Sequence, residues 1–152
     1  MNLLRSQRSL TIVEPNLYKL DESSWRWGPV LMPDEFKDPH ADDSGSGLYM
    51  DMDFMDKLHG LRMLVGSSMT ITPNGGFSST GHATGSAHYF GLAADIQFPK
   101  ADLSEVSNFI RQSSFNGVGF YPFWNTPGFH VDTLSRRARW IRIKNGSYVS
   151  LT

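Results

Sequence analysis

The 152-residue sequence contains no cysteine and only five histidines. The absence of cysteine excludes disulfide bonds, thiolate metal sites and cysteine nucleophiles. The common metal ligands that remain are histidine, aspartate and glutamate. Any metal site or catalytic site in this chain must therefore use these side chains.

The sequence also has little net charge and no long apolar run. A formal net charge of −1 argues against nucleic-acid binding, which usually needs a basic surplus. No segment approaches the roughly 20 apolar residues that span a membrane, and residues 1–18 lack the apolar core of a signal peptide. We expect synthesis in the cytoplasm, no membrane insertion and no nucleic-acid partner. Action on a cell wall would then require release by another agent.

Length and composition predict one folded domain over residues 1–152. The chain is 39% hydrophobic and 12% aromatic, which is typical of a globular protein. Residues 1–47 are rich in turn formers and form a predicted loop-rich segment, with a short strand at 10–13. Trp25 and Trp27 are expected to pack this segment onto the core.

The rest of the chain alternates helical and extended patterns. Apolar residues recur at helical spacing in 51–65 and 102–113, and each segment has acidic residues at its start. Strands are predicted at 69–72, 93–98, 118–121, 129–133, 138–143 and 148–151, with a loop at 73–87 and an Asn-Gly turn at 145–146. This order predicts an α+β fold with a mainly antiparallel sheet.

Two short segments carry the candidate chemistry. His88 and Asp95 are seven residues apart, and a turn at Gly91 would bring both side chains to one ion. His130, on a later strand, would supply a third ligand. A hydrolytic zinc site needs three such ligands and one open position. The plainer interpretation is that each histidine is a surface residue or a satisfied core residue.

Asp132 lies two residues after His130 on the same predicted strand, so both side chains point to one face. Asp132 could act as the general base. It could instead orient a ligand histidine by a hydrogen bond. Spacing does not separate these two roles.

The pattern Ser86-x-His88-x-x-Gly91-x-Ala93-x-Asp95 resembles the signature of the zinc D-Ala-D-Ala carboxypeptidase family. This family includes vancomycin-resistance dipeptidases, phage L-alanyl-D-glutamate endopeptidases and murein endopeptidases, and its fold is similar to the Hedgehog signalling domain. Residues 117–121 and 129–132 resemble its closing block, and residues 33–142 follow its order of elements.

The resemblance implies that His88, Asp95 and His130 bind zinc, with a water nucleophile and an antiparallel sheet flanked by helices. Two positions depart from the family pattern. Many members carry an acid three residues before the last ligand, where this chain has Pro127. Many also carry a substrate-binding arginine in the loop after the central strand, and residues 72–82 contain none. Asp132 is therefore the predicted base.

Three further side chains are candidates for substrate contact. His82 is the one residue of segment 72–82 that could be cationic. Ser86 lies near the substrate in the family, although it could equally be a turn serine that bonds to its own backbone. Tyr121 could donate to an oxyanion, but a half-buried strand aromatic is the favoured interpretation.

The sequence thus predicts a monomeric zinc peptidase that acts on peptidoglycan peptides as an endopeptidase or carboxypeptidase. A phage product such as an endolysin or virion component would explain the missing signal peptide. The alternative is an inactive zinc-binding structural or binding domain on the same scaffold. The HExxH motif is absent, so the zincin class is not supported.

Overall fold

A computed structural model describes residues 17–19, 25–40 and 49–151. The strand predicted at residues 10–13 lies outside these ranges. Trp27 is only 2% exposed and belongs to the core, and the Trp25 ring packs edge-on against it. Within the described ranges, no helix has the length and apolar character needed to cross a bilayer.

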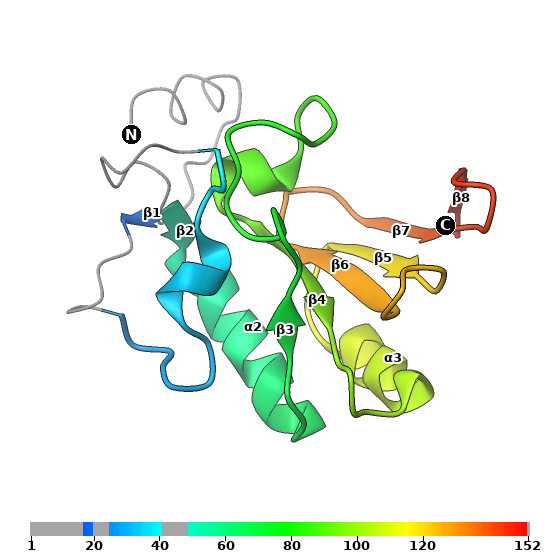
Figure 1. Ribbon diagram of the computed structural model, residues 1–152, viewed down its shortest axis with the longest axis horizontal. Coiled ribbons are helices and arrows are strands. Elements are labelled where there is room, and N and C mark those ends of the chain that lie inside the picture. Colours follow the sequence, from blue (N-terminus) through cyan, green and yellow to red (C-terminus); the bar gives the residue numbers. More distant parts are fainter. Residues whose placement is uncertain (1–16, 20–24, 41–48, 152) are drawn as a thin grey trace.

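The elements are arranged as a small two-stranded sheet, a six-stranded sheet and two helices (Figure 1). The small sheet pairs β1 (Leu17–Lys19) with β2 (Tyr49–Asp51), and the large sheet has the order β3-β4-β6-β5-β7-β8. Its strands are β3 (Thr70–Ile71), β4 (Ala93–Gln97), β5 (Gly117–Tyr121), β6 (Gly128–Asp132), β7 (Ala138–Arg142) and β8 (Tyr148–Ser150). The helices are α2 (Met52–Val65) and α3 (Leu103–Gln112), with short 3-10 helices η1 (Pro33–Phe36) and η2 (Ala87–Phe90).

The predicted α+β fold is confirmed, with one addition to its topology. Every neighbouring pair in the large sheet is antiparallel except β5 and β7, which run parallel.

The two predicted helices are also present, and capping residues define their ends. Asp51 accepts a hydrogen bond from the Phe54 amide at 2.9 Å, Asp102 caps α3, and Gly66 ends α2 at φ 69°.

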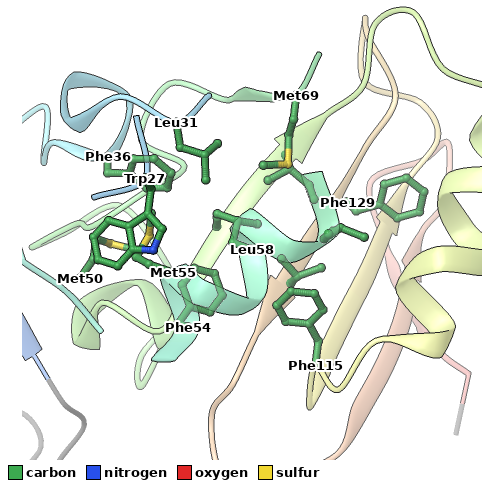
Figure 2. Packing of buried hydrophobic residues seen from close by; sticks show 14 of the residues in the cluster. Trp27, Leu31, Phe36, Met50, Phe54, Met55, Leu58, Met69, Phe115 and Phe129 are labelled. Atoms are coloured by element: carbon green, nitrogen blue, oxygen red, sulfur yellow. The ribbon is translucent and has the colours of Figure 1, made fainter. Parts of the chain in front are cut away.

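One face of the large sheet forms the hydrophobic core. Alternate residues of β4 and β6, such as Ile96 and Phe129, lie in a cluster with buried side chains of both helices. Figure 2 labels Phe54 and Leu58 of α2 and Phe129 of β6 among the side chains of this cluster. Because α2 and α3 contribute to the same core, these two helices flank the large sheet on the same face.

The opposite face carries the polar residues of the predicted site. The register places Asp95 of β4 opposite His130 of β6, His130 opposite Gly119 of β5, and Gly119 opposite Trp140 of β7. Paired residues in neighbouring strands share a face, so these side chains lie in one row across the sheet. A Cβ at Gly119 would overlap the Trp140 indole, and glycine therefore leaves room for that ring.

Gly117 leaves room for the Asp132 carboxylate, as Gly119 does for the Trp140 ring. A Cβ built at Gly117 would overlap the carboxylate of Asp132, which is buried and held by several bonds. We expect Gly117→Ala to lower the free energy of unfolding by about 1–3 kcal/mol, the usual cost of overpacking. Chemical denaturation would measure this, with Gly60→Ala as the control because a Cβ there meets nothing within 4 Å. Equal stability of Gly117→Ala and the wild type would contradict the packing argument.

Candidate metal centre

A pocket of about 540 Å³ opens on the polar face of the large sheet. Its walls come from residues 82–88, from β4, β6 and β5, and from the segment that includes β7 and β8. All three predicted metal ligands line this pocket, together with Asp132 and the three predicted substrate-contact residues.

His88 is fixed in the pocket wall by its backbone and by one ring nitrogen. It lies in η2, where the Ser86 side chain accepts from the His88 amide at 3.2 Å and Gly91 ends the helix at φ 68°. The His88 Nδ1 lies 2.9 Å from the Gly76 carbonyl oxygen. A carbonyl only accepts, so Nδ1 carries a proton, and Nε2 is the ring nitrogen left to face Asp95. That Nε2 lies 3.3 Å from Asp95 Oδ1.

The loop before η2 positions both of these side chains through its backbone. The Asp95 amide donates to the Gly75 carbonyl at 2.8 Å, and the Thr72 amide donates to the Asp95 carbonyl at 3.0 Å. Gly76, the next residue, supplies the carbonyl that holds His88. A Cβ at Gly75 or Gly76 would overlap neighbouring backbone atoms. The glycines of this loop therefore allow a close backbone clamp on two candidate ligands.

His130 lies between two carboxylates. Its Nδ1 is 2.9 Å from Asp95 Oδ1 and its Nε2 is 2.7 Å from Asp132 Oδ2. Burial lowers the pKa of His130, but the hydrogen bonds to Asp132 and Asp95 outweigh it and raise the pKa to about 9. Burial likewise opposes ionisation of Asp95, but the nearby charge of His88 and the hydrogen bond from His130 hold its pKa well below the usual range.

Asp132 is completely buried, at 0% exposure, and both of its oxygens have partners. Arg136 donates to Oδ1 at 2.7 Å and to Oδ2 at 3.0 Å, and the Leu134 amide donates to Oδ1 at 3.1 Å. Burial alone would raise the pKa of Asp132, but the bonds from His130 and Arg136 lower it to about 2. Asp132 is therefore ionised at neutral pH and fixed against His130.

The donor atoms suit a divalent cation. Asp95 Oδ1 faces a ring nitrogen from each of two histidines, at 3.3 and 2.9 Å. The lone pair of His88 Nε2 would face this anionic oxygen unfavourably unless a cation or a proton lay between them. Two imidazoles and a carboxylate are common zinc donors. The group whose ligand atoms all lie within 4.8 Å of one another is His82, His88 and Asp95, which differs from the predicted set by having His82 in place of His130 and which could hold a metal ion.

The three predicted substrate-contact residues have different surroundings. The His82 ring stacks on His88 with centroids 3.9 Å apart, and its Nε2 lies 2.9 Å from the Asn74 carbonyl oxygen. Burial and the neighbouring His88 lower the pKa of His82. The Tyr121 hydroxyl accepts from the Trp140 indole at 3.1 Å, and burial raises the pKa of this phenol.

Two pocket residues were missed by the sequence interpretation. Trp140 lies beside His130, with ring centroids 5.1 Å apart, and Arg136 bonds to Asp132. The sequence did hold a local signal for Arg136: it follows Asp132 by four residues, a spacing that allows an ion pair between them. Trp140 had no local signal, because only the parallel pairing of β5 with β7 brings it to the pocket.

Comparisons with known proteins identify the family of the chain. No curated protein and no solved structure matches the chain significantly. Residues 43–132, more than half of the chain, match the family described as Peptidase M15. The matched segment includes all three predicted ligands as well as Asp132. The chain therefore belongs to the peptidase M15 family, whose members are zinc-dependent metallopeptidases.

Proposed function

We propose that this protein is a zinc peptidase that hydrolyses peptide bonds of bacterial peptidoglycan, with zinc held by His88, Asp95 and His130. The observation that carries the proposal is the convergence of two imidazoles on one Asp95 oxygen in an open pocket. Family membership supports the reaction class. The resemblance of residues 86–95 to D-Ala-D-Ala carboxypeptidases supports peptidoglycan as the substrate, with release by a phage as the proposed route to the wall.

Ring geometry favours His130 over His82 as the third ligand. A ring nitrogen binds metal along a lone pair that lies in its own ring plane. The His82 and His88 rings are stacked, with 10° between their planes, so their lone pairs do not converge on one point. The His88 and His130 rings are inclined at 68°, which allows both to point at one ion beside Asp95.

The surrounding residues would prepare this site for hydrolysis. When bound, zinc supplies the Lewis acidity that activates water and polarises the scissile carbonyl. Gly76 and Asp132 fix the two histidines through the ring nitrogens that face away from the metal position. Tyr121 keeps its proton near neutral pH and so offers a hydrogen-bond donor in the pocket. We therefore propose that Asp132 orients His130, the second of the two roles that spacing left open.

A second candidate function is a zinc-binding domain without peptidase activity. Among the described residues that line the pocket, the carboxylates are Asp95 and Asp132. Asp95 is hydrogen-bonded to His130 and Asp132 to Arg136, so neither is free to act as a general base. Pro127 also stands where many relatives have an acid. This alternative predicts bound zinc together with intact muropeptides after prolonged incubation.

Zinc content and bond cleavage test the proposal together. We expect one zinc per purified chain and a loss of turbidity of cell-wall suspensions that a chelator abolishes and added zinc restores. Mass spectrometry of the products would identify the bond and separate endopeptidase from carboxypeptidase activity. Zinc without any new product would support the second candidate, and a chain that binds no zinc would refute both.

Zinc binding should strengthen as pH rises, because zinc must replace the proton on a ligand histidine. In the metal-free protein the pKa of His130 is raised to about 9. The protonated form of His130 therefore stabilises the metal-free fold fully below pH ~6.5, the pKa of an unfolded histidine, and this stabilisation is lost as pH rises through about 9. The increase in Tm caused by zinc should therefore grow from pH 6.5 to 9. Activity should fall below about pH 6. Thermal melts with and without zinc would measure this, and a constant shift would contradict it.

A further inference from the structure

The pocket contains one arginine, Arg136, and the proposed zinc site uses only some of its N–H groups. Arg136 is the only Lys or Arg among the described residues that line the pocket. Its side chain is 40% exposed, whereas its partner Asp132 is fully buried. It follows β6, beyond the segment 43–132 that matches the family. Arg136 is therefore a fixed cation that a molecule entering the pocket can reach.

The ion pair with Asp132 leaves donors of Arg136 available. A guanidinium has five N–H groups. One hydrogen of Nη1 and one of Nη2 bond to the two Asp132 oxygens, at 2.7 and 3.0 Å. In the described part of the chain, no other hydrogen bond uses this guanidinium. Asp132 thus anchors one edge of the group, and the remaining N–H groups are held ready for a ligand.

The charges of the pocket favour an anionic ligand. Arg136 balances Asp132, and a divalent ion would exceed the single charge of Asp95. The loaded pocket is then net positive and attracts an anion. The guanidinium fork matches a carboxylate. We propose, on the basis of the proposed peptidase function, that Arg136 binds a carboxylate of the peptide substrate.

Arg136 would supply the cation that segment 72–82 lacks, but it lies after the last candidate ligand in the sequence rather than before the first. In the structure, segment 72–82 instead forms hydrogen bonds through its backbone to Asp95 and His88. The substrate carboxylate has two possible sources in a stem peptide. One is the C-terminal carboxylate, and the other is the α-carboxylate of an interior D-glutamate.

Three synthetic peptides test the inference. The first is the free pentapeptide L-Ala-γ-D-Glu-L-Lys-D-Ala-D-Ala, the second is its C-terminal amide, and the third has D-isoglutamine in place of D-glutamate. Their Kd values would be measured by calorimetry with the metal-free full chain, which does not depend on cleavage, and their kcat and KM with the zinc-loaded chain. The variants are Arg136→Met and Arg136→Lys, with the exposed neighbour Arg137→Met as the control.

For the wild type, we expect amidation of one carboxylate to weaken binding roughly 10- to 100-fold, as for the loss of a charge-assisted bond. Arg136→Met should bind the free and amidated peptides equally, Arg136→Lys should discriminate to an intermediate degree, and Arg137→Met should behave as the wild type. The peptide whose amidation matters identifies the source of the carboxylate.

Two results would overturn the inference. One is a wild type that binds all three peptides equally. The other is an Arg136→Met variant that loses affinity for every peptide by the same factor, because that is the effect of a purely structural ion pair with Asp132. Failure of the peptidase proposal would look different. The zinc-loaded wild type would then leave every peptide intact while still preferring the free carboxylate.

Discussion

Asp95→Asn should bind zinc at least about 100-fold more weakly than the wild type and lose at least about 1,000-fold in kcat/KM. Asp95 Oδ1 is the atom that both proposed ligand histidines face, at 3.3 and 2.9 Å. Asparagine keeps the shape of the side chain but removes the charge that attracts the cation. The loss in rate follows because metal Lewis acidity contributes several kcal/mol to hydrolysis.

Zinc titration with a competing chromophoric chelator and peptide kinetics would measure the two effects. His88→Ala should give the same loss of zinc, because its Nε2 is the second convergent donor. Asp53→Asn is the matched control, since Asp53 is an exposed acid in the first turn of α2. An Asp95→Asn protein that retains one tightly bound zinc and full activity would exclude Asp95 as a ligand.

Asp132→Asn should lower zinc affinity about 10- to 100-fold, the usual effect of removing the partner of a metal-bound histidine. Asp132 fixes His130 through a 2.7 Å bond and is itself held by Arg136. Excess zinc should restore most of the activity, because the zinc ligands themselves remain. We also expect about 1–3 kcal/mol of lost stability, since the buried carboxylate loses its charge-assisted bonds.

The same variant separates positioning from base catalysis. If Asp132 were the general base, kcat would fall about 100- to 10,000-fold at saturating zinc, while zinc affinity stayed near the wild-type value. Arg136→Lys is an informative companion, because it keeps a positive charge beside Asp132 but not the paired donors. A kcat that stays low at every zinc concentration in Asp132→Asn would reject the positioning role.

Much of the secondary structure could be predicted because its signals are local. The ends of α2 and α3 depend on nearby caps at Asp51 and Asp102, and Gly66 and Gly91 adopt the left-handed backbone that glycine favours. Local patterns do not show how strands pair. The parallel pairing of β5 with β7, and the placement of both helices on one face, depend on contacts far apart in the chain.

The sequence by itself determined the candidate donors, because the lack of cysteine and the two histidine motifs left few alternatives. Only the tertiary structure decided what surrounds them. It showed that Arg136 pairs with the buried Asp132, that burial and His88 lower the pKa of His82, and that the loop after β3 holds two candidate ligands through its backbone. The physical reason is that ionisation and hydrogen bonding depend on burial and on neighbours from other strands, which residue spacing does not encode.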